Sequence, residues 1–318
     1  MKLDKDSIGQ MTQNLTDKAG KAAKSLAAKG KQTISRSKDS VVSKIDLNGD
    51  GKVDIEDIVT LGLKTPGIRI RRDDFLAKEL IKTQPKEVID KAIATTPAQA
   101  GISQEEIESI AENVIKYERL CVTGISTALG APGGAAMAAT IPADIIQYYG
   151  YMLRAAQKLM YLYGFPEIGI NEETQGFDSE TMNILIVCLG VMYGVAGANN
   201  AIKAIANAFA KGVEKKLLNT ALTKGTLYPL VKSVAKWFGV RMTKDVFAGF
   251  FKKTIPVVGG VIGGGLTFVS FKPCCDKLKA SLNDTLLSNP NHKADDKEEL
   301  FINNGFIEVD YSESEQDK

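Results

Sequence analysis

Several residue types that carry out chemistry are scarce in this chain of 318 residues, which has one histidine, one tryptophan and four cysteines. His292 lies in the polar stretch SNPNHKADD. Catalysis by a histidine base and metal sites with two histidines are therefore not expected. The cysteines show no zinc-site spacing, and residues 1–13 lack the pattern of a secretory signal. We expect reduced thiols in a cytoplasmic protein; the cysteines are Cys121, Cys188, Cys274 and Cys275.

Signals of β-structure and of common catalytic motifs are also missing. No stretch alternates apolar and polar residues over six positions, and no Asn-Gly or Asp-Gly joins two β-branched runs. The glycine-rich stretch VVGGVIGGGL lacks the Lys-Ser/Thr of a phosphate-binding loop and the strand-then-helix setting of a dinucleotide site. We predict an all-α helical bundle with glycine-rich apolar helices and no dedicated small-molecule cofactor. Catalytic residues stay unassigned, and we favour a non-enzymatic function.

Charge is nearly balanced overall but unevenly distributed. The formal net charge of +2 argues against a dedicated nucleic-acid binder. Residues 1–45 carry ten Lys/Arg and four Asp, a net of +6, whereas residues 283–318 carry ten Asp/Glu and three Lys, a net of −7. Residues 1–40 are either a solvated, partly helical tail or a segment attracted to anionic lipid or nucleic acid. Near anionic lipid each cation contributes about 1 kcal/mol.

Residues 46–57, DLNGDGKVDIED, have the spacing of an EF-hand calcium loop. Such a loop supplies oxygens from positions 1, 3, 5, 7, 9 and 12 and has glycine at position 6. Oxygen side chains at alternate positions converge only if the chain wraps the ion, and Gly51 permits the positive φ that this wrap requires. The alternative is an Asp/Asn/Gly turn without metal. We predict a Ca²⁺ site, with Mg²⁺ as a competitor, whose ligands are Asp46, Asn48, Asp50, the Lys52 carbonyl, Asp54 and Asp57.

Asp57 closes the loop where Glu is usual, so the following helix must approach the ion more closely. The stretch DLNGDGKVDIEDI in this respect resembles the dockerin-type loop, whose last ligand is also Asp. Dockerin loops come in pairs, and this chain has no second copy. The resemblance supports calcium binding and does not imply dockerin's extracellular cohesin partner. A lone site with Asp at position 12 should bind calcium weakly to moderately.

Signals for helix starts and stops divide the rest of the chain. IEDIVTLGL predicts a helix that Pro66 and Gly67 end, and RRDDFLAKELIK predicts the start of another. Ser103 and Glu106 stand three apart as a capping box for a helix that we expect to end near Leu120.

Three runs contain no charged residue: residues 120–143, 181–202 and 254–271. Each is about as long as a membrane span, which needs roughly 17 to 25 residues. Each is also crowded with small residues, and glycines at 130, 133 and 134 break the first run into two pieces. Two interpretations remain open. The runs are either buried helices of a globular bundle or hairpins that insert into or lie on a membrane.

The most regular helical pattern covers residues 142–164, where two adjoining apolar stripes predict a mostly buried helix. Its remaining side carries polar residues that we treat as a possible polar pocket. The alternative is structural, with Asp144 in the first turn after Pro142 and Arg154 paired to any carboxylate. The pocket candidates are Asp144, Gln147, Tyr151 and Arg154.

The stretches ATIPADIIQYYGYMLRAAQKLMYLYGFPE and KKTIPVVGGVIGGGLTFVSF resemble the bacterial EcsC-like family. That family has a similar proline-plus-Asp helix ending in Tyr-Gly, and a glycine-rich IPVVGG helix near its end. The resemblance covers residues 76–282. It implies a bacterial, mostly helical protein that is linked by name to an ABC-transporter operon, without an established reaction. The cation loop would then be an accessory module.

These patterns together predict four segments and a function. The segments are a basic, flexible tail (1–40), an EF-hand-like segment (41–75), an EcsC-like helical domain (76–282) and an acidic, disordered tail (283–318). We expect a calcium-binding protein at the inner face of the cell membrane, with an anionic membrane surface or a membrane transporter as its partner. One alternative is a hydrolase that uses the pocket around Asp144 and Arg154. Another is an integral or pore-forming membrane protein.

Overall fold

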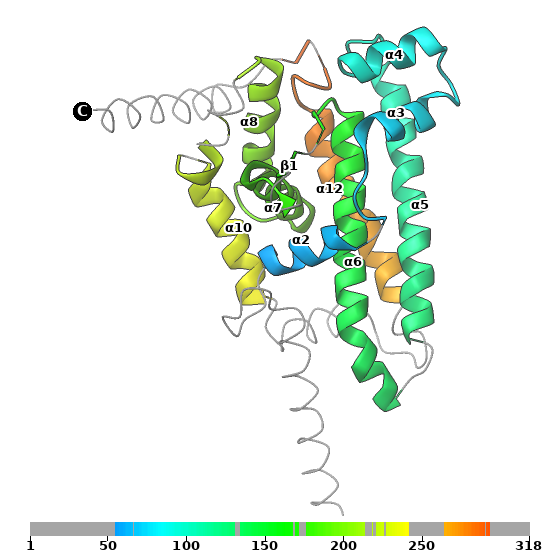
Figure 1. Cartoon of the computed structure of the whole chain (residues 1–318), viewed down its shortest axis with the longest axis vertical. Coiled ribbons are helices and arrows are strands. Elements are labelled where there is room, and N and C mark those ends of the chain that lie inside the picture. Colours follow the sequence, from blue (N-terminus) through cyan, green and yellow to red (C-terminus); the bar gives the residue numbers. More distant parts are fainter. Residues whose placement is uncertain are drawn as a thin grey trace, which may run out of the picture. The chain divides into compact units, whose positions relative to one another are not determined.

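The structure of the chain, a computed structural model, is built of helices (Figure 1). Two strands of two residues each pair antiparallel, Ile170 with Phe177 and Asn171 with Gly176. The prediction of an all-α bundle is confirmed. The elements are α2 (Ile55–Lys64), α3 (Arg72–Leu80), α4 (Lys86–Ala94), α5 (Gln104–Gly130), α6 (Gly134–Leu162), β1 (Ile170–Asn171), β2 (Gly176–Phe177), α7 (Ser179–Tyr193), α8 (Ala198–Ala210), α10 (Tyr228–Arg241) and α12 (Gly264–Asn283).

The chain divides into two compact units after Lys52, and every residue that the structure describes belongs to the second unit. Residues 1–40, most of the expected acidic tail and all but one of the expected cation ligands lie outside the described residues; within that tail, residues 283–289 and 291–292 are described. The described residues are 55–65, 67–130, 134–167, 169–171, 176–213, 218, 221–225, 227–241, 264–289 and 291–292.

Helix α5 packs against both α6 and α12 and starts where the sequence predicts. The Glu106 N–H donates to Ser103 Oγ at 3.2 Å, which is the first half of the capping box. The Glu106 carboxylate accepts two hydrogen bonds of 2.8 Å from the Gln84 amide, so it ties α5 to the turn before α4. The expected end near Leu120 is wrong, because α5 continues to Gly130. It continues because its packed face persists, with Val122 and Ser126 both fully buried.

Helix α6 begins at Gly134, so the first uncharged run is divided between the end of α5 and the start of α6. The break falls at the glycines that predicted it. Asp144 is therefore well inside α6, and its expected place in the first turn is wrong. The alanines and Met137 before it are good helix formers, which extends the helix toward the N-terminus. Both apolar stripes are buried; their buried members include Tyr149, Met152, Leu153, Ala155, Ala156, Leu159, Met160, Leu162 and Tyr163.

Helix α2 packs against α6, α7 and α10, so it is part of the helical body and not an accessory module. Glycines allow the close crossing of α2 and α6. A Cβ atom on Gly62 would lie 3.4 Å from the Gly150 Cα and 3.0 Å from the Leu153 Cδ1. The helix ends at Lys64 and is followed by Gly67 at a φ of 81°, as the stop signal predicts.

The second uncharged run forms α7 and the start of α8, with a break at Gly194 and Gly197, whose φ angles are 71° and 85°. Residues 184–192 of α7 are all buried, in keeping with the interpretation of this run as a buried helix. Only residues 264–271 of the third run are described, and they open α12. Within the described part of the chain, no helix combines the length and apolar character needed to cross a membrane.

Candidate functional site

Of the expected cation ligands, only Asp57 lies within the described residues. It is in the first turn of α2, where the positive end of the helix dipole favours a carboxylate, and it is 4% exposed. The described residues contain no group of three or more His, Cys, Asp or Glu placed to hold a metal ion. The ligands that lie outside the described residues are Asp46, Asn48, Asp50, Lys52 and Asp54.

Of the four residues of the expected polar pocket, the structure describes the side chains of Gln147, Tyr151 and Arg154. The side chain of Asp144 lies outside the described part, and α6 rises about 1.5 Å per residue, which places the Asp144 and Arg154 backbones about 15 Å apart along the helix axis. The Gln147 amide is buried without a hydrogen-bond partner among the described residues. The Tyr151 and Arg154 side chains come together, with the guanidinium carbon 6.0 Å from the ring centroid.

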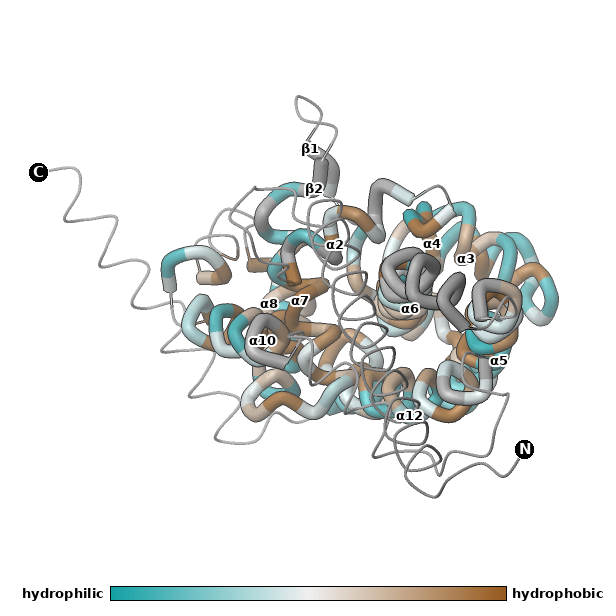
Figure 2. Tube along the Cα trace, turned by 90° about the horizontal axis from the view of Figure 1, so that it is seen from below, coloured by the Kyte–Doolittle hydropathy of each residue, from teal (hydrophilic) through white to brown (hydrophobic). Residues whose placement is uncertain are grey.

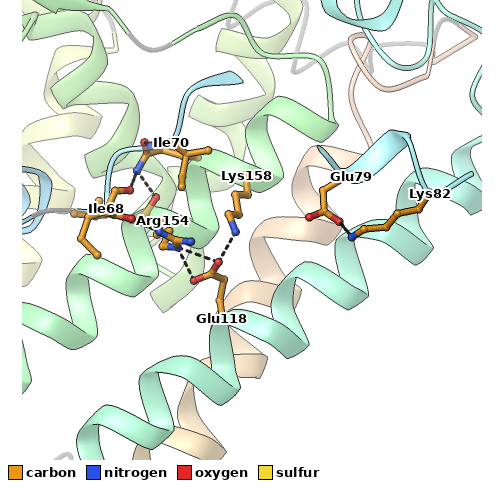
Figure 3. Close-up of polar contacts among 10 residues, drawn as sticks. Ile68, Ile70, Glu79, Lys82, Glu118, Arg154 and Lys158 are labelled. Carbon is orange, nitrogen blue, oxygen red and sulfur yellow. Dashed lines mark hydrogen bonds and ion pairs between the residues drawn. The ribbon is translucent and has the colours of Figure 1, made fainter. Parts of the chain in front are cut away.

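Arg154 instead belongs to a charge cluster built on Glu118 of α5, which is fully buried. The Arg154 Nε lies 3.0 and 2.9 Å from the two Glu118 oxygens, and the Lys158 Nζ lies 2.5 Å from Oε1. Figure 3 shows both cations of α6 pointing at this one carboxylate. The cluster holds α5 against α6, because a buried ion needs its partners to offset desolvation.

Glu118 was missed in the sequence because it stands on the apolar face of α5. The neighbouring turns of that face carry Val114, Ile115 and Val122, all buried. A carboxylate in such a stripe is a signal of a buried ion pair, and Arg154 and Lys158 on the polar side of α6 are the matching cations.

Helix α6 also holds residues 65–71, which we call the α2–α3 segment. Arg154 Nη1 donates to the Gly67 carbonyl. Gln157 donates to the Ile68 carbonyl at 3.2 Å and accepts from the Ile70 N–H at 3.0 Å (Figure 3). The Tyr161 hydroxyl donates to the Ile70 carbonyl at 3.2 Å. Residues at 154, 157 and 161 share one face of α6, so the chain leaving α2 is fastened along two turns of that helix.

Arg72 fixes the far end of the α2–α3 segment. Its buried guanidinium donates to the carbonyls of Phe165 at 3.1 Å, Ile93 at 2.6 Å, Ala92 at 3.2 Å and Thr95 at 2.7 Å. Burial lowers the pKa of Arg72. The Ala92, Ile93 and Thr95 carbonyls lie at the end of α4, where a helix leaves its last acceptors unpaired, and the Phe165 carbonyl follows α6. The segment after α2 is thereby held at both ends.

A cavity of about 310 Å³ lies near the start of α7, and its lining does not include Glu118, Arg154 or Lys158. Its wall is mostly apolar, and burial raises the pKa of the Glu167 carboxyl on its rim. That carboxylate accepts from the Arg72 N–H at 2.5 Å. The cavity is small for a ligand pocket. The described residues that line it are Met160, Phe165, Pro166, Glu167, Gly169, Glu180, Thr181, Ile184, Phe209 and Val213.

The arrangement favours structural over catalytic roles. Arg154 and Lys158 occupy the Glu118 carboxylate, which leaves it poorly suited to act as a base. All four cysteines are free thiols, as expected, and burial raises the pKa of the Cys188 and Cys275 thiols, which disfavours the nucleophilic thiolate.

Comparison of the chain with protein-family models, with curated proteins and with solved structures finds no match. The resemblance to the EcsC-like family stays a prediction from the two quoted stretches.

Proposed function

We propose that this protein is a calcium-binding, membrane-associated helical protein in which calcium acts on the helical body through α2. One observation carries the proposal: the helix that follows the cation loop is packed inside the bundle. Asp57, the last expected ligand, is buried in its first turn. A calcium ligand that belongs to α2 is connected to α6 directly, because α2 packs against α6.

The loop chemistry explains why the ion would bias α2. Four of the expected ligands are carboxylates, and they repel one another until a divalent cation neutralises them. Asp57 is one methylene shorter than the usual Glu, so ion binding draws the first turn of α2 toward the loop. The glycine crossing and the fastened α2–α3 segment oppose movement of α2 alone. The pull is therefore passed to α6.

We propose that this calcium-responsive helical protein is associated with a membrane. This association is supported by the net charge of +6 in residues 1–45 and by the uncharged runs. We propose the cytoplasmic side of the membrane, with an anionic lipid surface or a membrane transporter as partner. The EcsC-like resemblance favours the same setting.

Isothermal titration calorimetry of the full chain tests the metal site. We expect calcium binding in the wild type, weakened by excess Mg²⁺ and lost in Asp46→Ala. The matched control is Asp90→Ala, which removes an exposed carboxylate of α4 and should leave binding unchanged. No heat in the wild type, or equal binding in Asp46→Ala, would contradict the proposal.

The two alternatives from the sequence gain no specific support. A hydrolase centred on Asp144 and Arg154 would need the guanidinium for its substrate, whereas Arg154 is bound to Glu118 and Gly67. No contact within the described residues favours an integral or pore-forming protein.

A further inference from the structure

Helices α5 and α12 form an antiparallel pair, and one half of this pair carries charged side chains. Lys279 lies 3.0 Å from Glu108 and 2.6 Å from Glu112, and Lys272 lies 3.1 Å from Glu112. The hydrogen bond from Lys279 lowers the pKa of Glu112. This half has the surface of an ordinary solvated protein.

The other half of the pair carries no charge. α5 has no charged residue after Arg119, and α12 has none before Lys272. Its internal polar contacts are neutral: Thr267 Oγ lies 3.1 Å from Ser126 Oγ, and Ser270 Oγ lies 3.0 Å from the Tyr148 hydroxyl of α6. Residues 134–143, which open α6, are also uncharged. We call residues 120–130, 134–143 and 264–271 the uncharged end. Helix α5 ends at the bottom of Figure 1, and Figure 2 shows the molecule from that side.

Exposed apolar side chains gather at this end. Six large apolar side chains are exposed in the described part of the chain, and five of them lie in or beside the uncharged end. The sixth, Ile81, follows α3. Single exposed apolar residues are common, but a group of them marks an interaction surface. The five are Tyr117 (58% exposed), Leu120 (56%), Val269 (52%), Phe268 (39%) and Ile125 (37%).

Aromatic and basic side chains mark the boundary between the two halves. The Arg119 guanidinium lies 3.3 Å from the Phe268 ring centroid, and its Nε donates to the Phe268 carbonyl at 2.6 Å. Exposed Tyr117 and Lys116 lie within one turn of Arg119 on α5. Aromatic rings and long cationic side chains are the groups enriched where protein crosses from lipid to water.

The direction of the polarity change distinguishes lipid from a protein partner. Helices that pair with another helix carry an apolar stripe along their length. Here polarity changes along the axes of α5 and α12, from a charged half to an uncharged end. A flat surface that covers one end of the helices matches this pattern. The net charge of +6 in residues 1–45 adds attraction to an anionic surface.

We propose that the uncharged end docks into the interfacial layer of an anionic lipid bilayer, with Tyr117 and Arg119 at the level of the headgroups. This inference rests on the membrane half of the proposed function and names the surface responsible. Leu120, Phe268 and Val269 would enter the layer, and the charged ladder of Glu108, Glu112 and the α12 lysines would remain in water.

Vesicle flotation of the full chain tests this surface. We expect the wild type to float with phosphatidylcholine–phosphatidylserine vesicles and to float less with phosphatidylcholine alone. Leu120→Gln/Val269→Gln should weaken partitioning by about tenfold or more, because two exposed apolar side chains lose their transfer into lipid. Ile81→Gln is the matched control and should float like the wild type. Circular dichroism of each variant checks that it is folded.

The outcomes separate the inference from the proposed function. A wild type that ignores both vesicles overturns both the docking surface and the membrane half of the proposed function. A double variant that floats like the wild type overturns the docking surface alone. If light scattering shows a wild-type dimer that the double variant loses, and neither floats, the end is an interface between copies and the inference is wrong. Calorimetry reports separately on calcium.

Discussion

Glu118 shows at the scale of single residues how a local pattern and a tertiary contact differ. The polar side of α6 predicts that Arg154 needs a carboxylate, and the structure supplies it from α5, where Glu118 is fully buried. Asp144, the carboxylate of the expected polar pocket, lies about 15 Å along the α6 axis from Arg154. The partner could not be read from α6 because it is 36 residues away in the chain.

Removing the Glu118 charge should destabilise the fold strongly. Glu118→Gln leaves Arg154 and Lys158, whose side chains are only 23% and 9% exposed, without their counterion. We expect the free energy of unfolding to fall by about 3–5 kcal/mol in urea denaturation, the usual effect of breaking a buried pair.

The control is Asp74→Asn, which removes the partner of Arg71; both side chains are 70% exposed. Such a pair contributes about 0–1 kcal/mol, so this variant should unfold almost like the wild type. Equal, small effects of the two substitutions would show that the Glu118 cluster does not hold α5 to α6.

At the scale of elements, small residues set the distances between helices. The glycines of the uncharged runs suggested close packing, and Gly190 of α7 shows it. A Cβ there would lie 2.8 and 2.9 Å from the two Val234 methyl carbons of α10 and 3.0 Å from the Ala198 Cβ of α8. The glycine is needed because three helices meet at it.

Gly190→Ala should therefore destabilise the protein by about 1–3 kcal/mol, the typical effect of overpacking. Helix propensity alone predicts the opposite sign, because alanine is favoured over glycine by about 1 kcal/mol. Gly124→Ala in α5 is the matched control: a Cβ there meets nothing within 4 Å, so this variant should be at least as stable as the wild type. Thermal unfolding of both variants measures the difference, and a stabilised Gly190→Ala would contradict the packing.

At the scale of the whole molecule, the position of α2 connects the predicted ion site to the bundle. Calcium bound to the folded chain should raise the stability of the helical body as a unit, because α2 unfolds with it. Calcium at a hundred times its dissociation constant contributes about 2.7 kcal/mol, or about 5–10 °C in the melting temperature of a domain this large.

Circular dichroism melts in calcium and in a chelator measure this shift. Asp57→Asn should abolish it, and Asp90→Ala should keep it. Calcium binding by calorimetry without any shift would mean that the loop binds its ion independently of the helical body.

Local chemistry by itself determined the helical class, the starts of α3 and α5, the stop after α2 and the spacing of the cation loop. These features depend on residues a few positions apart, whose side chains meet within one turn. Only the tertiary structure decided the length of α5 and the pairing of Glu118 with Arg154 and Lys158. It also decided the packing of α2 within the bundle and the grouping of exposed apolar side chains at one end. Each of these depends on contacts between segments far apart in the chain, and such contacts leave no local spacing to read.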